Sequence, residues 1–127
     1  MDFISPSVIK RIASKYGFVF KKGLGQNFLS SQDVLEEIAI AAEIDDGGVI
    51  EIGPGFGVLT NELAERAKKV LALEIDERLI PILEDTLGEY DNVRVINQDI
   101  LKTDVKKLID DEFDGEKLVL RQICRII

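Results

Sequence analysis

The chain has 127 residues, of which 46% are apolar and 31% charged, with a formal net charge of −8. This size allows one modest domain with a hydrophobic core, and the composition is that of a soluble globular protein rather than a disordered or fibrous one. No apolar run is long enough to span a membrane, the first residues do not form a secretory signal, and the single cysteine, Cys124, has no internal disulfide partner, so we expect a cytoplasmic protein.

The charge is unevenly distributed along the chain. Residues 1–32 hold five basic side chains and one acidic one, so their net charge is +4. Since the whole chain carries −8, residues 33–127 carry −12. The basic residues are Lys10, Arg11, Lys15, Lys21 and Lys22. Such an arm favours contact with a polyanion, although a solvated basic helix face explains the charge equally well.

The first third of the chain has the pattern of two helices. Ser5 and Pro6 are typical of a helix start, and an apolar stripe follows until Gly17. A loop is expected over residues 18–29. A second helix is expected from Ser30 to just before Asp45.

From residue 49 onward, strand and helix patterns alternate. Strands are expected at residues 49–52, 70–75 and 93–96, and a fourth begins at 118–120, with helices at 58–67 and about 79–87. Pro81 requires that the later helix either starts near Ile80 or kinks. This alternation indicates an α/β fold with a parallel sheet and right-handed crossovers.

A glycine-rich turn joins the first strand to its helix. Gly53, Gly55 and Gly57 allow a sharp turn and a close backbone approach to a ligand, as in nucleotide-type cofactor loops. A dinucleotide fingerprint would need a further glycine at Val58. The Glu51-x-Gly-x-Gly-x-Gly pattern instead resembles the S-adenosylmethionine loop of Rossmann-like methyltransferases, with a nicotinamide-binding domain as the competing interpretation.

An acidic residue lies at or near the end of each of three successive strands. Glu51, Glu74 and Asp99 are expected at the carboxyl edge of the sheet, where open parallel sheets bind ligands. Glu74 stands where an acid can accept both ribose hydroxyls, and Asp99 can accept from the amino group of an adenine. Together they favour a ligand that contains ribose and adenine.

Four segments strengthen the interpretation. They are Phe-Lys-Lys-Gly-Leu-Gly-Gln-Asn-Phe-Leu at residues 20–29, Glu-Ile-Gly-Pro-Gly at 51–55, Leu-Glu-Ile-Asp at 73–76 and Asn-Gln-Asp-Ile at 97–100. In this order they resemble the ribosomal-RNA adenine dimethyltransferases, whose relatives include the erythromycin-resistance methyltransferases. The resemblance implies transfer of two methyl groups from S-adenosylmethionine to N6 of adenines in small-subunit rRNA, with no metal and no membrane partner.

The resemblance also implies roles for individual residues. Asn27 and Leu29 would touch the cofactor from the N-terminal loop, Gly53 would lie against its methionine portion, Glu74 would hold the ribose, and Asp99 would bind the adenine. The full cofactor set implied is Asn27, Leu29, Glu51, Gly53, Gly55, Glu74, Ile75, Asp99 and Ile100. The five basic residues would contact the RNA backbone. Residues 1–32 would form a basic helix with a cofactor-covering loop, and residues 33–127 the methyltransferase domain.

The last residues depart from the family pattern. The family carries Asn-Leu-Pro-Tyr after the fourth strand, where the asparagine and the aromatic ring receive the target adenine. Residues 121–127 instead read Arg-Gln-Ile-Cys-Arg-Ile-Ile, so we assign no catalytic residue and expect little or no activity. One choice of synonymous codons, read two nucleotides later, gives Ala-Ala-Asn-Leu-Pro-Tyr-Tyr, which suggests a frameshift. The later strands and the family's helical C-terminal domain are expected to be missing.

Three functions remain open from the sequence. The chain is a truncated rRNA adenine dimethyltransferase that keeps its cofactor site, a non-catalytic module that binds S-adenosylmethionine or RNA, or a non-functional gene remnant.

Overall fold

A parallel sheet is the centre of the fold in a computed structural model that describes residues 6–17, 37–40, 45, 47–113 and 120–125. Within these residues the sheet has four strands, β1 (Gly48–Ile52), β2 (Lys69–Glu74), β3 (Val93–Asn97) and β4 (Leu120–Arg125), in the order β3-β2-β1-β4. All neighbouring strands pair in parallel. The predicted parallel sheet is therefore confirmed, including its fourth strand.

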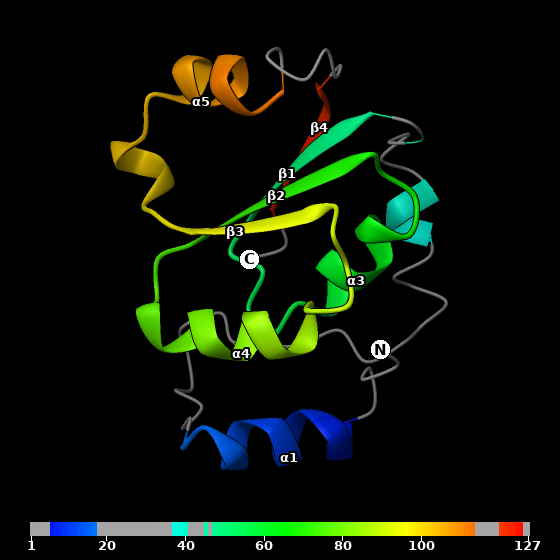
Figure 1. Cartoon of the computed structure of the whole chain (residues 1–127), viewed down its shortest axis with the longest axis vertical. Helices are drawn as coiled ribbons and strands as arrows, with labels where there is room; N and C mark the ends of the chain where they lie inside the picture. Colours follow the sequence, from blue (N-terminus) through cyan, green and yellow to red (C-terminus); the bar gives the residue numbers. More distant parts are fainter. Residues whose placement is uncertain (1–5, 18–36, 41–44, 46, 114–119, 126–127) are drawn as a thin grey trace.

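Helices connect the strands and cover both faces of the sheet (Figure 1). They are α1 (Pro6–Lys15), α3 (Val58–Ala64), α4 (Ile80–Thr86) and α5 (Val105–Glu112), with short 3-10 helices η1 (Glu77–Leu79) and η2 (Ile100–Lys102). Residues 37–40 are also helical, within the second predicted helix. None of the helices described here is long and apolar enough to cross a membrane.

The two alternatives that Pro81 left open are resolved by where α4 begins. Pro81 lies in the first turn of α4, which starts at Ile80 directly after η1. A proline in the first turn removes a backbone N–H that has no helical partner, so the helix does not need to kink.

Two hydrophobic layers form because successive strand residues point to opposite faces. Val49 and Val70 lie in the larger layer, together with residues of α1, α3 and α4. Ile50 and Leu71 lie in the smaller one, beneath Phe113 at the end of α5. Figure 1 shows α5 on one side of the sheet and α1, α3 and α4 on the other. The sheet is therefore packed against helices on both of its faces.

The helix α5, which was not predicted from the sequence, is fixed to the amino edge of the sheet. Its Asp104 side chain caps the first turn by accepting the Lys107 N–H at 3.1 Å. At its other end, Glu112 pairs with Arg94 and with Lys69, whose Nζ lies 3.2 Å from the Glu112 carboxylate. These ion pairs close the edge opposite the one where the predicted site residues lie.

Candidate cofactor site at the carboxyl edge of the sheet

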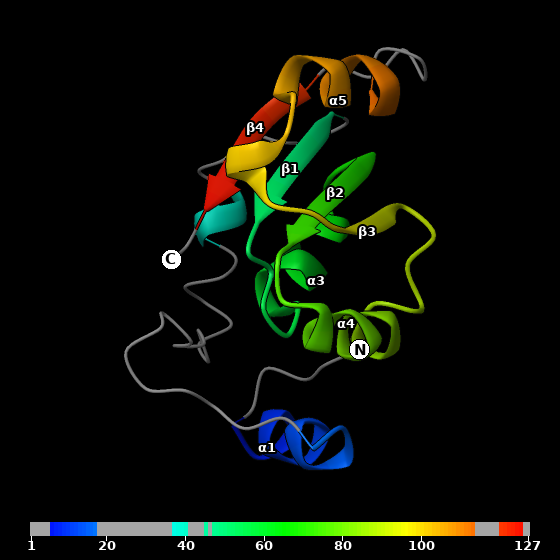
Figure 2. The same cartoon turned by 90° about the vertical axis from the view of Figure 1, so that its left-hand side faces the viewer.

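The turn after β1, the end of β2 and the segment after β3 meet at one edge of the sheet (Figure 2). The register places Ile52 opposite Leu73 and Glu74 opposite Asn97, so that residues 53–57, 75 and 98–100 leave the sheet side by side. This is the edge at which open parallel sheets bind ligands. The structure therefore brings together the three described segments of the predicted cofactor site.

The glycine turn has a backbone shape that side chains rarely allow. Gly53, Gly55 and Gly57 have φ values of 71°, 61° and 84°, all in the left-handed region. A Cβ added to Gly57 would also lie 3.2 Å from side-chain atoms of Leu83 in α4 and of Leu87 directly after it. At this position the dihedral angle favours glycine, and the tight packing of these two leucines adds to the cost of a side chain.

Backbone hydrogen bonds hold this turn at several points. The Gly53 N–H donates to the carbonyl of Leu73 at 2.9 Å, which continues the β1–β2 pairing past the end of β1. The Gly57 N–H donates to the Pro54 carbonyl at 2.9 Å. From α4, the buried hydroxyl of Thr86 donates to the Phe56 carbonyl at 3.0 Å. These three hydrogen bonds fix the backbone of the turn at its start, middle and end.

Glu74 connects this turn to the end of β2. Its Oε1 accepts the Gly55 N–H at 3.2 Å and its Oε2 accepts the Asp76 N–H at 3.0 Å. Burial raises the pKa of Glu74, and the N–H groups of Asp76 and Gly55 oppose this rise because they stabilise the ionised form. A carboxylate oxygen can accept more than one hydrogen bond, so Glu74 retains acceptor capacity for a ligand.

Glu51 lies beneath the turn. It is only 1% exposed, and its Oε1 accepts the hydroxyl of Thr60, in α3, at 2.5 Å. Burial raises the pKa of Glu51 to about 7, the Thr60 hydroxyl lowers it, and the charge of Glu74 raises it further. Thr60 was not among the predicted site residues, since nothing in its local sequence indicates that a hydroxyl nine residues along would face Glu51.

The segment after β3 is attached to the end of β2. The Asn97 side-chain amide donates to the Glu74 carbonyl at 2.8 Å and to the Ile75 carbonyl at 3.2 Å. The Asp99 side chain caps η2 by accepting the Leu101 N–H at 2.9 Å. Ile75 is 67% exposed at this edge, whereas Ile100 is partly buried against the layer beneath α5. Asn97 was also missed as a supporting residue, although it stands in one of the segments that carry the family resemblance.

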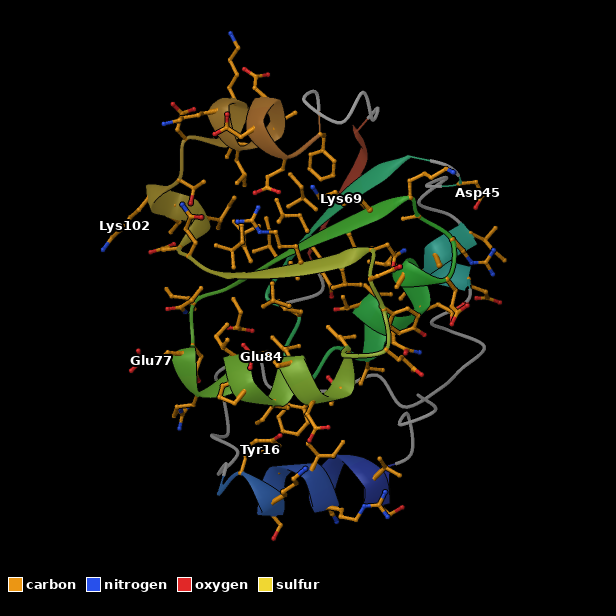
Figure 3. All side chains as sticks on the ribbon, in the orientation of Figure 1. Tyr16, Asp45, Lys69, Glu77, Glu84 and Lys102 are labelled. Atoms are coloured by element: carbon orange, nitrogen blue, oxygen red, sulfur yellow. The ribbon has the colours of Figure 1, made fainter. Side chains whose placement is uncertain are left out.

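The predicted basic residues do not all have the same surroundings. Lys10 and Arg11 are exposed on α1. The Lys15 ammonium lies 2.8 Å from the Asp85 carboxylate of α4, which raises the pKa of Lys15 and lowers that of Asp85. The Tyr16 hydroxyl donates to the same carboxylate at 2.7 Å, and Figure 3 shows Tyr16 on the side of α1 that faces α4.

Four predicted site residues, Lys21, Lys22, Asn27 and Leu29, lie outside the described residues. In the part of the chain that is described, no group of three or more His, Cys, Asp or Glu side chains is arranged to hold a metal ion.

Comparison with known proteins identifies the family. Residues 17–124 match the family described as "Ribosomal RNA adenine dimethylase". The chain belongs to this family. Ribosomal RNA small subunit methyltransferase A of Geobacillus sp. (strain WCH70) is 56% identical over 115 residues, which cover 90% of this chain and 40% of that protein. The protein of the same name from Staphylococcus aureus (strain bovine RF122 / ET3-1) is 53% identical over 121 residues, 94% of this chain and 41% of that protein.

Solved structures support a Rossmann-like methyltransferase fold for this member of the dimethylase family. The 23S rRNA methyltransferase ErmE is 44% identical with a TM-score of 0.57, over 61% of this chain and 32% of that chain. A dimethyladenosine transferase from Plasmodium falciparum is 37% identical with a TM-score of 0.53, over 57% of this chain and 28% of that one. The chain spans about 40% of the length of the curated relatives described above.

Proposed function

We propose that the chain binds S-adenosylmethionine at the carboxyl edge of β1, β2 and β3, and that the protein to which it corresponds dimethylates N6 of adenines in small-subunit rRNA. The observation that carries the proposal is the position of Glu74, whose carboxylate holds the glycine turn on one side and the β2 end on the other. The names of the relatives and the family of the chain support the same activity.

Each side chain of the edge has a task in this proposal. Gly53 and Gly55 let the backbone approach the methionine portion of the cofactor, and Glu74 accepts hydrogen bonds from the ribose hydroxyls through its remaining lone pairs. Ile75 and Ile100 provide apolar surface for the adenine, and Asp99 accepts from its amino group. Glu51 supports the turn from beneath, and Asn27 and Leu29 cover the cofactor from the N-terminal loop.

The N-terminal arm is proposed as the contact to RNA. Lys10 and Arg11 present exposed positive charge on α1, and Lys21 and Lys22 follow in the same arm. In this proposal residues 1–32 form the arm and residues 33–127 the methyltransferase domain. Ile12 and Ala13 of α1 attach the arm to the domain, because they share the larger hydrophobic layer with α3 and α4. A ribosomal small-subunit precursor in the cytoplasm is the proposed partner.

The methyl-transfer step depends on residues beyond the cofactor edge. β4 pairs with β1 so that Cys124 lies opposite Glu51 and Arg125 opposite Ile52. Residues 121–125 of β4 belong to the segment that stands where the family carries its Asn-Leu-Pro-Tyr motif. Since a target adenine needs an orienting amide and a stacking ring, we propose that this 127-residue chain binds the cofactor but transfers methyl groups slowly or not at all. This also favours a non-catalytic binding module as the second candidate function.

Two measurements test the proposal. Isothermal titration calorimetry of the 127-residue chain with S-adenosylmethionine is expected to show binding at one site, and absence of binding would contradict the cofactor assignment. A methylation assay on unmodified small-subunit particles is expected to give no dimethyladenosine above background. Dimethyladenosine formation would show that residues 121–127 supply what the family motif normally supplies.

A further inference from the structure

The glycine turn has little means of fixing its own shape. Of its five residues, Gly53, Gly55 and Gly57 have no side chain, and all three have left-handed φ values. Glycine loses more conformational freedom on folding than any other residue, so beyond the turn's own hydrogen bond from Gly57 to Pro54 its rigidity depends on its neighbours. Those neighbours therefore decide how well the turn fits a bound cofactor.

Most of the contacts that hold the turn come from β2 and α4. Glu74 and Leu73 in β2 accept N–H groups of Gly55 and Gly53, and Thr86 in α4 donates to Phe56. These contacts fix the middle of the turn. They do not connect the strand that enters it with the helix that leaves it.

Besides the apolar packing of β1 and α3 in the larger layer, the hydroxyl of Thr60 makes this connection with a hydrogen bond. Glu51 is the last but one residue of β1, Thr60 is the third residue of α3, and their side chains meet at 2.5 Å underneath the turn. Thr60 is 0% exposed and Glu51 is 1% exposed, so water does not compete for this bond. A buried hydrogen bond from a hydroxyl to a carboxylate is stronger than one between two neutral groups.

We propose that Thr60 is a positioning residue for the cofactor, which acts by donating its hydroxyl to Glu51 and thereby fixing the distance between β1 and α3 at the two ends of the glycine turn. Thr60 does not touch the cofactor in this proposal, because it is fully buried on the side of the turn that faces the larger hydrophobic layer. The inference rests on the proposed binding of S-adenosylmethionine.

A buried carboxyl at this position is not explained by packing alone. An apolar side chain of similar volume would avoid the cost of burying Glu51, which is high enough to raise its pKa to about 7. The Val49 side chain, two residues earlier on the same face, shows that the layer accepts apolar residues. The pair is therefore explained better by its geometry across the turn than by its contribution to the core.

The decisive comparison is between Thr60→Val and Thr60→Ser. Valine has the shape of threonine without its hydroxyl, whereas serine keeps the hydroxyl and loses the methyl group. We expect Thr60→Val to weaken S-adenosylmethionine binding about tenfold, and Thr60→Ser to bind within about threefold of the unmodified chain, as measured by titration calorimetry. Equal affinity of Thr60→Val and the unmodified chain would overturn the proposal.

A matched control separates positioning from general destabilisation. Asn92 holds the opposite end of α3, where its amide donates to the Ala64 and Ala67 carbonyls at 2.9 and 3.1 Å. We expect Asn92→Ala to lower the melting temperature but to leave the affinity for S-adenosylmethionine unchanged. A loss of affinity equal to that of Thr60→Val would show that any loosening of α3 weakens binding, and would contradict a specific role of Thr60.

A second variant keeps the test valid if Thr60→Val does not fold. Thr60→Ala also removes the hydroxyl and leaves a smaller side chain in its place, so we expect it to weaken S-adenosylmethionine binding by about the same factor as Thr60→Val. Binding within about threefold of the unmodified chain would overturn the positioning role. If the unmodified chain binds no S-adenosylmethionine, the proposed function fails, whereas binding that Thr60→Val leaves unchanged contradicts only the role of Thr60.

Discussion

The carboxylate of Glu74 accepts the backbone N–H of Gly55 at 3.2 Å, although the two residues are 19 positions apart in the chain. The bond joins the end of β2 to the middle of the glycine turn after β1. Since Glu74 is also the residue proposed to hold the ribose, the group that binds the cofactor and the group that shapes its loop are the same side chain.

The double role of Glu74 predicts a large effect when its carboxylate is removed. Glu74→Ala loses the acceptor for two backbone N–H groups and for the ribose, so we expect S-adenosylmethionine affinity to fall by between about tenfold and a hundredfold. Calorimetry measures this loss. Glu84→Ala, on the exposed surface of α4, is the matched control and should bind normally. Unchanged binding by Glu74→Ala would contradict the assignment.

Gly57 and Gly17 allow a test of why the turn needs glycine. Both have positive φ values, 84° and 65°, but a Cβ at Gly57 would meet Leu83 and Leu87 at 3.2 Å, whereas a Cβ at Gly17 would meet nothing within 4 Å. We expect Gly17→Ala to lower the free energy of unfolding by about 1–2 kcal/mol, and Gly57→Ala to lower it by more. Urea unfolding measures both values. Equal losses would show that the packing of α4 adds no constraint.

The burial of Glu51 predicts an unusual dependence of stability on pH. Its pKa rises from an ordinary value of 4.5 to about 7 in the folded chain. Between these values the folded protein retains a proton that the unfolded chain has released, so the free energy of unfolding falls as pH rises from about 4.5 to about 7, and the loss is complete above that range. The total contribution of Glu51 is on the order of 3 kcal/mol, and the raised pKa of Glu74 acts in the same direction.

Comparing the unmodified chain with Glu51→Gln isolates this contribution from that of other titrating groups. Glutamine does not titrate, so the variant should lose less stability between about pH 4.5 and pH 7 than the unmodified chain does. Urea unfolding at several pH values gives the two profiles. Parallel profiles would show that Glu51 has an ordinary pKa in the folded state.

The basic residues of α1 should differ in their contribution to RNA binding. Lys10 and Arg11 are exposed, whereas the ammonium of Lys15 already pairs with Asp85. We expect Lys10→Ala and Arg11→Ala each to reduce the salt dependence of binding to small-subunit rRNA by about one ion. Lys15→Ala should have a smaller effect. Filter binding over a range of salt concentrations measures the slopes, and a Lys15→Ala effect as large as the others would contradict this order.

The sequence by itself determined the elements whose causes are local. The alternation of short β-branched runs with helical stripes indicated a parallel α/β sheet, and three glycines between a strand and a helix marked the turn, because glycine is the residue that allows left-handed backbone there. The order of the motifs also placed Glu74 and Asp99 at one edge, since carboxyl ends of parallel strands share an edge. Helix α5 was missed although Asp104 is a typical N-cap and Val105, Leu108 and Ile109 have the spacing of one helical face.

Only the tertiary structure decided which polar side chains face one another. Glu51 and Glu74 look alike in the sequence, yet Glu51 lies buried against Thr60 and Glu74 holds the turn. Lys15 resembles the other basic residues of the arm, but α4 brings Asp85 to it across 70 positions of sequence. These pairings depend on how helices pack against the sheet. A local pattern carries no information about such distant contacts, because each residue's own neighbours in sequence are compatible with several packing partners.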